Sequence, residues 1–313
     1  MCEVFLHLSI NYQIKKLKPK TKKYIITGIK LTISLVLIYY IFFVKLHIFD
    51  IFSHYKNANW LYIAIATVLY ILSQALSVFR LDYYFRDINL DLSYKSNARL
   101  YFLGMFYNTF VPGGIGGDAY KVYVLNKNYK ISLKEISQAV FLDKIIGLSA
   151  MLLMIVFLIY LSNLTDYPWV QYGSLAVSIV GFVAVPFILG LIFRVHKRTF
   201  YNSMIYSIVL QLIQVGMLYF VLEALNIRPE NFNIYLLIFL VSGILSIISF
   251  SGFGIREAVF MYAAHRFNFD ETLATSAAFI FSIITISISF IGIIYLFKGV
   301  KIEEKKKRTK ISF

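Results

Sequence analysis

The chain has 313 residues, of which 59% are hydrophobic and 15% are charged, and its mean hydropathy is +0.71. Soluble domains carry about 25% charged residues, so this composition excludes an ordinary soluble fold. The formal net charge of +15 does not indicate nucleic-acid binding, because the Lys and Arg residues fall between apolar runs and at the termini rather than on one face. That distribution is typical of membrane topology signals.

Cysteine and histidine usage excludes the commonest structural sites. Cys2 is the only cysteine, so no intramolecular disulfide can form, and the five histidines have no ligand-like spacing. The sequence also lacks Walker A, His-Glu-x-x-His and Gly-x-Ser-x-Gly motifs. We therefore expect no metal or other cofactor, and no enzyme of the common nucleotide-dependent or hydrolytic kinds.

The first apolar run predicts a membrane span near the N-terminus. Residues 1–24 form a basic segment before it, which by the positive-inside rule is cytoplasmic. The run at 25–44 is too long for a signal peptide and no small-residue cleavage site follows it, so it is expected to stay as a helix. A second span at 59–79 leads back to a basic cytoplasmic segment, where Arg80 can snorkel to the interface.

The next segment, 100–120, does not resemble an ordinary span. About a dozen apolar residues are interrupted by Val-Pro-Gly-Gly-Ile-Gly-Gly-Asp at 111–118. Broken backbone at membrane depth is tolerated only where it is buried in protein or lines a wet cavity. Four lysines follow between 121 and 134, which indicates a return to the cytoplasmic side. The segment is therefore a candidate re-entrant hairpin.

The remaining apolar runs predict spans three to six and a last span. They lie at about 136–162, 170–194, 203–225, 234–250 and 272–297. A second glycine-broken segment at 251–269 precedes the last span. If that segment is re-entrant, the basic tail 298–313 lies outside, against the positive-inside rule; if it crosses, eight crossings place the tail inside. We favour the second arrangement.

These runs predict an all-α polytopic membrane protein with about seven to eight transmembrane helices and one or two glycine-broken segments that could be re-entrant. The broken segments share a pattern at 114–119 and 252–258, in which Gly-x-Gly is followed by an acidic residue and Ala. Paired glycine-interrupted segments in two halves of a chain indicate a transporter's binding site. The shared pattern is short, and chance is the alternative explanation.

Charged residues near the broken segments are candidates for a polar site. They are Asp118, Lys121, Asp143, Lys144, Arg256 and Glu257. Charges inside a span are costly unless they face a partner or a cavity, and this near-neutral set suits a headgroup that carries phosphate and an amine. The alternatives are a helix N-cap at Asp118, an interface marker at Asp143 and Lys144, and a structural network that satisfies itself. For Gln211 and Gln214, which share a helical face, hydrogen bonds between helices are favoured.

Three motifs together closely resemble a known family. They are Gly-Met-Phe-Tyr-Asn-Thr-Phe-Val-Pro-Gly-Gly-Ile-Gly-Gly-Asp-Ala-Tyr-Lys at 104–121, Leu-Asp-Lys-Ile-Ile-Gly at 142–147 and Gly-Phe-Gly-Ile-Arg-Glu-Ala at 252–258. The chain resembles the transmembrane region of lysylphosphatidylglycerol synthases, also called the flippase-like domain family, over roughly 25–297. The resemblance implies one multi-helix flippase-like domain at 25–297.

The resemblance also implies a set of substrate-binding positions. Those that match the first motif are Asn108, Pro112, Gly113, Gly114, Gly116, Gly117 and Asp118, and those that match the last are Gly252, Gly254, Arg256 and Glu257. Lys121 and Lys144 stand where many members have Arg, which keeps the charge but loses bidentate phosphate geometry. Ser251 and Phe253 replace a Pro and a Gly often found beside Gly252. Asp143 completes the expected set.

The family's best-known members carry a cytoplasmic transferase that aminoacylates phosphatidylglycerol, while the membrane part moves the product between leaflets. The short tail after 297 leads us to expect translocation without synthesis. The leading hypothesis is a lipid translocase in a bacterial plasma membrane, with a membrane phospholipid or a lipid-linked precursor as its substrate. The alternatives are a non-transporting partner of a separate lipid-modifying enzyme and a membrane-embedded enzyme acting on a lipid phosphate.

Overall fold

A computed structural model describes residues 58–110, 115–162, 167–193, 196–229, 231–246, 254–298 and 303. The expected first span, the basic N-terminal segment and most of the C-terminal tail lie outside these residues. So do four candidate site positions, Pro112, Gly113, Gly114 and Gly252. The arrangement below concerns the compact unit Asn57–Phe313 by itself.

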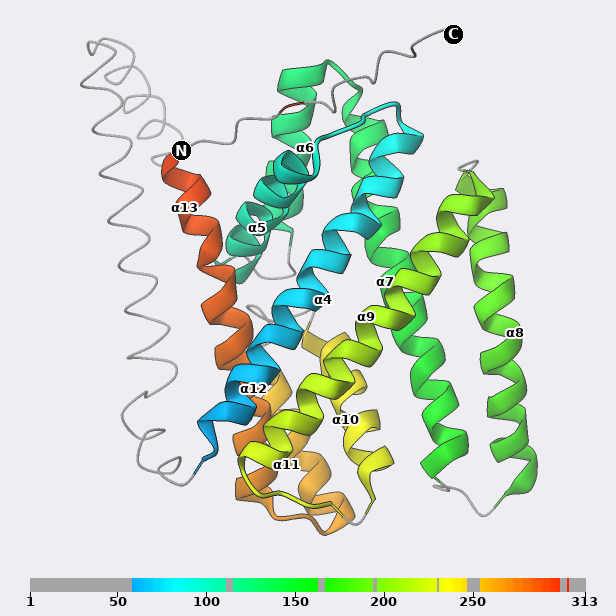
Figure 1. The fold of residues 1–313 in the computed structure, drawn as a ribbon. Helices are drawn as coiled ribbons and strands as arrows, with labels where there is room; N and C mark the ends of the chain where they lie inside the picture. The colour runs from blue at the N-terminus through cyan, green and yellow to red at the C-terminus, as the bar shows by residue number, and fades with distance from the viewer. Residues whose placement is uncertain are drawn as a thin grey trace, which may run out of the picture. The chain divides into compact units, whose positions relative to one another are not determined.

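The described residues form helices joined by short connections (Figure 1). The helices are α4 (Trp60–Asp87), α5 (Tyr94–Phe110), α6 (Gly116–Tyr129), α7 (Leu133–Ser162), α8 (Pro168–Phe193), α9 (Lys197–Ala224), α10 (Phe232–Leu245), α11 (Ile255–Phe267), α12 (Glu271–Ser289) and α13 (Ile291–Lys298). Five are long and apolar enough to cross a membrane: α4, α7, α8, α9, and α12 continued by α13. The expected all-α polytopic membrane class is confirmed.

Most of the described Lys and Arg residues lie at one end of the helices. Asp87 at the end of α4 lies beside His196 before α9, with 3.1 Å between Oδ1 and Nδ1, and Gln138 of α7 donates a hydrogen bond to the carbonyl of Phe193 in α8. The described Lys and Arg residues near the helix ends on this side are Arg86, Lys95, Arg99, Lys127, Lys130, Lys134, Lys197, Arg198 and Lys298. We call this end the basic face.

The other end of the helices, here called the opposite face, carries few cations. Asn59 before α4 donates its N–H to the carbonyl of Ala224 at the end of α9, and Asn233 of α10 donates to the carbonyl of Leu161 in α7. Among the described residues near the helix ends there, only Arg228 and Arg266 are Lys or Arg. This asymmetry between the faces is the one that sets membrane orientation.

Two hairpins of short helices enter the unit from different faces. In the first hairpin, α5 starts at the basic face and α6 ends there (Figure 1). In the second hairpin, α10 starts at the opposite face and α11 ends there. The rings of Tyr235 near the start of α10 and Phe269 just after α11 lie 4.5 Å apart, which brings both ends of the second hairpin together. These helices have 13 to 17 residues, and about 20 are needed to cross a bilayer. Each of these four helices is therefore too short to cross a bilayer by itself.

The two halves of the unit have the same plan with opposite orientation. α4 runs to the basic face, the α5–α6 hairpin enters from that face, and α7 returns to the opposite face (Figure 1). α9 runs to the opposite face, the α10–α11 hairpin enters from there, and α12 with α13 returns to the basic face. α4 packs against α9 at the centre. Inverted repeats built around broken helices are typical of secondary transporters.

The second hairpin changes the expected path of the chain after span five. Both sequence-based arrangements treated 234–250 as a complete span, but α10 has only 14 residues and pairs with α11 instead. With α12 and α13 as the last crossing, the chain reaches the basic face, where Glu303 accepts a hydrogen bond from the N–H of Ser93 and donates one to Ser96 Oγ. A re-entrant second segment is thus compatible with a last crossing that ends at the basic face.

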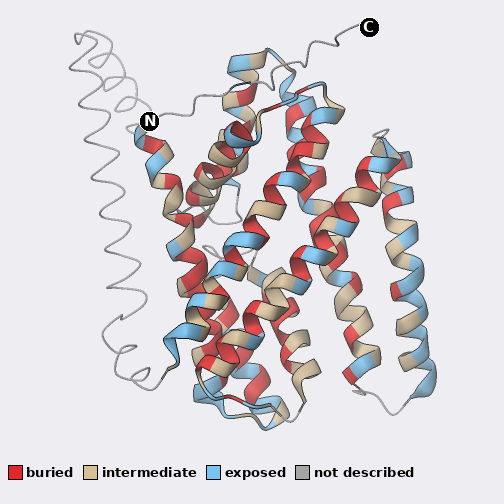
Figure 2. Cartoon of the chain, in the orientation of Figure 1, coloured by how far each residue is buried: buried red, intermediate tan, exposed pale blue. Residues whose placement is uncertain are grey.

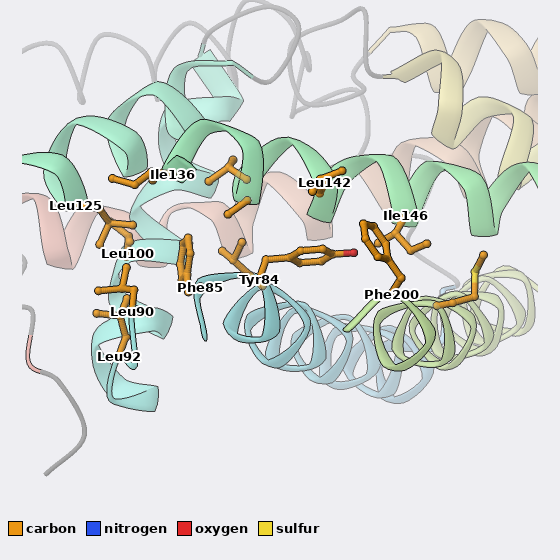
Figure 3. Packing of buried hydrophobic residues seen from close by; sticks show 14 of the residues in the cluster. Tyr84, Phe85, Leu90, Leu92, Leu100, Leu125, Ile136, Leu142, Ile146 and Phe200 are labelled. Carbon is orange, nitrogen blue, oxygen red and sulfur yellow. The ribbon is translucent and has the colours of Figure 1, made fainter. Parts of the chain in front are cut away.

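The main apolar core lies between α4, α5, α6, α7 and α9 toward the basic face (Figure 3). Its fully buried side chains include Leu81, Tyr84, Phe85, Leu100, Leu125, Ile136, Leu142, Ile146 and Phe200. α8 is different, because it leaves large apolar side chains such as Val177, Val180 and Ile192 exposed along its length (Figure 2). An exposed apolar helix of this kind is expected where the surrounding solvent is lipid.

Asp270 is the N-cap residue of α12, which follows the second hairpin. Its carboxylate accepts a hydrogen bond of 2.8 Å from the N–H of Leu273. We expect Asp270→Ala to destabilise the protein by about 1 kcal/mol, because an unpaired N–H remains at the helix end. A lowered melting temperature in detergent would show the loss. Glu271→Gln, a neighbouring change that keeps the cap, should lower it less, and equal effects of both changes would contradict the capping role.

Candidate functional site

A polar cavity of about 400 Å³ lies between the two hairpins. Its walls belong to α4, α7 and α9, and the described ends of both hairpins reach it, through Asn108 and Asp118 on one side and Gly243 and Ser246 on the other. The other polar and charged side chains that line it are Tyr70, Gln74, Ser77, Arg80, Tyr101, Lys121, Asp143, Lys144, Gln211 and Gln214. Its volume falls in the range of small-ligand sites, about 300 to 1,000 Å³.

Asp118 organises one end of this cavity. It lies in the first turn of α6, where the helix dipole favours a negative charge. Its Oδ1 is 3.3 Å from Nζ of Lys121, three residues later, and its Oδ2 forms an ion pair with Lys144 of α7. Lys121 is buried and its ammonium lies 5.1 Å from the ring centre of Tyr101, whereas the side chain of Lys144 is 46% exposed. One carboxylate thus faces two ammonium groups.

Arg80 and Asp143 form a second, closed pair in the cavity wall. Arg80 Nε and Nη2 donate to the two carboxylate oxygens of Asp143 at 2.8 and 3.2 Å, and Nη1 donates to Ser207 at 3.0 Å. Their side chains are only 11% and 10% exposed. A Cβ at Gly147 would lie 2.8 Å from Arg80 Nη1, so this glycine leaves room for the guanidinium.

Asp143 and Lys144 are adjacent in the sequence, but their side chains have different partners in the structure. Asp143 pairs with Arg80 and Lys144 pairs with Asp118, so both take part in pairs between helices. Sequence reasoning placed Arg80 at the interface and missed its role. The available signal was a polar stripe on α4, where Ser73, Ser77 and Arg80 recur every three or four residues on one helical face.

The glycines of the first hairpin bring α5 and α6 into backbone contact. A Cβ added at Gly117 would lie 2.7 Å from Cα of Gly104 and closer still to its carbonyl oxygen. The N–H of Gly117 donates a 2.6 Å hydrogen bond to Oδ1 of Asn108, which ties the start of α6 to α5. Gly116 begins α6 one residue earlier. This contact positions Asp118 and Lys121 toward α7.

The described residues of the last motif, 254–258, do not line the cavity. Gly254 has a φ of +82°, which favours glycine, and it precedes α11. Glu257 accepts hydrogen bonds of 2.6 Å from the Gly254 N–H and from Ser282 Oγ, so it caps α11 and ties it to α12.

Arg256 is 8% exposed, and its guanidinium carbon lies 4.3 Å from the ring centre of Phe281. Within the described part of the chain, its Nε and Nη1 atoms have no hydrogen-bond partner. The ring centre of Phe281 also lies 6.2 Å from that of Tyr70, which does line the cavity. The residue therefore lies one side chain behind the cavity wall.

Polar residues of α4 and α9 complete the cavity wall. Tyr101 donates a hydrogen bond of 3.1 Å to Gln74, and Gln214 reaches Ser73 at 3.5 Å, which is the contact between helices expected for the glutamines. Gln211 is buried as well, and among the described residues its Oε1 has no partner. Two glutamines that were expected to act structurally thus also face the cavity.

The side chains that line this cavity carry charges of both signs together with amide groups. Ammonium, guanidinium, carboxylate and amide groups converge on one volume. Across the part of the chain that the structure describes, no group of three or more His, Cys, Asp or Glu side chains is placed to hold a metal. The cavity can therefore bind a polar group through charge and hydrogen bonding.

Comparison with protein families finds a match that covers most of the chain. A family model described as the lysylphosphatidylglycerol synthase TM region matches residues 28–202 and 191–292. Comparison with curated proteins finds no match.

Proposed function

Because the chain belongs to the family of the lysylphosphatidylglycerol synthase TM region, we propose that it moves a phospholipid or a lipid-linked precursor between the leaflets of the membrane. It is a multi-pass membrane protein related to lipid handling. The proposed substrate places its headgroup in the polar cavity while its acyl chains stay in the hydrocarbon. The polar positions of the first and middle motifs bind the headgroup, and Arg256 and Glu257 support the site from the second hairpin.

The observation that carries this proposal is a charged cavity that the described parts of two opposed hairpins help to line. Charged side chains at membrane depth are costly and usually mark a pathway or a binding site. Here five of them, Arg80, Asp118, Lys121, Asp143 and Lys144, line one volume. In secondary transporters, sites at the interface of inverted repeats are made accessible to each side in turn. The inverted plan of this unit supports the same use for lipid.

Binding rather than acid–base chemistry is the role we assign to the two carboxylates. Asp143 gives both oxygens to Arg80, and Asp118 gives one oxygen to each of two lysines. A carboxylate held by cations in this way is poorly placed to take a proton from a substrate. We therefore propose translocation without chemical change of the lipid.

The proposed orientation follows from the charge of the two faces. The basic face lies in the cytoplasm of a bacterium and the opposite face outside, in agreement with the positive-inside rule. The N-terminus and the basic tail are then both cytoplasmic, and the expected first span supplies the remaining crossing.

Leaflet-resolved lipid movement in proteoliposomes tests the proposal. Lipids with a fluorescent acyl chain and an anionic, zwitterionic or aminoacylated headgroup are followed by quenching of the outer leaflet. We expect wild-type protein to move at least one of them, and Asp118→Asn to slow that movement about tenfold or more, because Lys121 and Lys144 lose their shared counter-charge. Arg256→Ala tests whether the second hairpin serves the same site.

The matched control is Asp91→Asn, which removes a carboxylate that is 58% exposed at the basic face. It should leave lipid movement unchanged. If folded wild-type protein moves no lipid of any class, translocation is refuted and a non-transporting partner of a lipid-modifying enzyme becomes the better reading. If Asp118→Asn moves lipid as fast as wild type, the cavity is not the pathway.

A further inference from the structure

A stripe of neutral polar side chains runs along α9 beside the cavity. Ser207, Gln211 and Gln214 recur at intervals of four and three residues, which places them on one face of the helix. Gln211 and Gln214 line the cavity, and Gln211 is only 5% exposed. The cavity therefore has a wall of amide and hydroxyl groups in addition to its charged pairs.

The first and last members of this stripe are hydrogen-bonded to α4. Ser207 accepts a hydrogen bond of 3.0 Å from Nη1 of Arg80, and Nε2 of Gln214 reaches Oγ of Ser73 at 3.5 Å. Gln211 lies between them and differs, because its Oε1 has no hydrogen-bond partner among the described residues. Within that part of the chain, Gln211 alone combines a buried unpaired side-chain atom with a place on the cavity wall.

The neighbouring neutral groups of α4 and α5 are already paired within the protein. Tyr101 donates to Oε1 of Gln74 at 3.1 Å, and Nε2 of Gln74 donates to Oγ of Ser73 at 3.2 Å. Ser77 donates to the carbonyl of Ser73 at 3.1 Å. These bonds hold the wall opposite the stripe, and they leave the acceptor of Gln211 to whatever occupies the cavity.

The chemistry of a side-chain amide decides which group suits Gln211. A buried acceptor that stays unpaired is costly, and a cavity of about 400 Å³ has room for a group that pairs with it. A hydroxyl both donates and accepts, so it satisfies the amide in either orientation. A phosphodiester has no hydrogen to donate, and an ammonium group has no lone pair to offer the amide N–H. A free hydroxyl is therefore the best match.

We infer that Gln211 is a specificity-determining residue, which accepts a hydrogen bond from a free hydroxyl of the headgroup in the cavity. The substrate is then a lipid with a polyol or sugar headgroup. This inference rests on the proposed function and narrows its substrate class. A headgroup of the same size without the hydroxyl displaces water from Gln211 and leaves the amide unpaired, so it is a poor substrate.

The test compares lipids of equal charge that differ only in hydroxyl groups. Proteoliposomes receive trace fluorescent phosphatidylglycerol or phosphatidylpropanol, whose headgroup keeps the phosphodiester and the carbon chain but has no hydroxyl. Phosphatidylinositol and phosphatidylcyclohexanol form a second pair with a larger headgroup. We expect the hydroxylated lipid of at least one pair to move about tenfold or more faster, because a site that pairs with a substrate hydroxyl rejects the analogue lacking it.

Several results would overturn the inference while leaving translocation in place. They are equal rates within both pairs, faster movement of the lipids without hydroxyls, and movement of phosphatidylethanolamine in the absence of movement by either hydroxylated lipid. Because these comparisons use wild-type protein, they do not depend on the folding of a variant.

Variants at Gln211 connect the preference to this residue. Gln211→Met keeps the length of the side chain and removes the amide, so it should bring the ratio of rates within the discriminated pair close to one. Its melting temperature in detergent should stay the same or rise, because a buried unpaired amide is removed. Gln211→Asn withdraws the amide by one carbon and should give an intermediate ratio.

Gln138→Met is the matched control. Gln138 donates a hydrogen bond of 3.3 Å to the carbonyl of Phe193 and does not line the cavity, so its loss should keep the wild-type ratio. A folded Gln211→Met protein that also keeps this ratio would refute recognition by Gln211. A lowered melting temperature in that protein would then assign the amide to a structural partner.

A soluble polyol phosphate shares the chemistry of the headgroup, so it needs its own arm. Radiolabelled glycerophosphoglycerol, the deacylated headgroup of phosphatidylglycerol, is offered to the same vesicles. Exclusion of this compound together with movement of phosphatidylglycerol supports the lipid. Its uptake without movement of any lipid would assign the cavity to a soluble ligand and overturn both the inference and the proposed function. Absence of all transport would refute translocation itself, and the inference with it.

Discussion

Replacing Gly117 with alanine is expected to open the first hairpin and to abolish lipid movement. The added Cβ would lie 2.7 Å from Cα of Gly104 and closer to the carbonyl oxygen of the same residue. Both neighbours are backbone, so no side chain can move aside and the helices themselves must separate. Overpacking of this kind costs about 1 to 3 kcal/mol, and contact with backbone places this variant at the upper end.

The separation also removes the contacts that place Asp118. The 2.6 Å hydrogen bond from Gly117 to Asn108 lengthens, and α6 carries Asp118 away from Lys144. Melting in detergent, followed by size-exclusion chromatography, measures the loss of stability, and the proteoliposome assay measures the loss of movement.

Gly173 supplies the matched control because it lies in α8 with nothing within 4 Å of an added Cβ. Gly173→Ala should be neutral or stabilising by up to about 1 kcal/mol. A Gly117→Ala protein that is as stable and active as Gly173→Ala would show that α5 and α6 do not approach as closely as the structure has them.

Removing one partner of the Arg80–Asp143 pair is expected to destabilise the protein more than removing both. Asp143→Asn leaves a guanidinium in the cavity wall without its counter-charge, and Arg80→Gln leaves the carboxylate in the same position. Breaking a buried pair costs about 3 to 5 kcal/mol, whereas the double variant buries no unpaired charge. Melting temperatures of the two single variants and the double variant form a double-mutant cycle that measures the coupling.

Asp91→Asn again serves as the control, since it makes the same chemical change in an exposed pair with Arg86, at 3.7 Å. Exposed pairs contribute about 0 to 1 kcal/mol, so little change is expected. Additive effects of the two cavity substitutions would mean that Arg80 and Asp143 do not interact in the folded protein.

The hairpins show where sequence reasoning about the fold succeeded and where it stopped. Proline and four glycines at 112–117 interrupt the apolar residues, so a break there was predictable from local chemistry. The second hairpin was harder, because 234–250 is an apolar run long enough to be read as a span. The structure reveals this hairpin through contacts between residues that are far apart in the sequence, such as Tyr235 and Phe269.

In the candidate site, too, some contacts were predictable from the sequence and others were decided only by the tertiary structure. Asp118 and Lys121 are three residues apart, and helical geometry alone predicts that they meet. Asp143 and Lys144 are adjacent in sequence, yet they point about 100° apart around α7 and find partners on different helices. Neither partner is encoded locally, which is why Arg80 was assigned to the interface.

The sequence by itself determined the solvent of this protein, its helical class, its family and the residue types of a polar site, because apolar run length, charge placement and glycine motifs are local properties. Only the tertiary structure decided that the hairpins enter from different faces, that α4 and α9 pack at the centre, and that five charged side chains line one cavity. Those facts depend on which helices pack together, and burial of a charge is decided by its neighbours in space rather than along the chain.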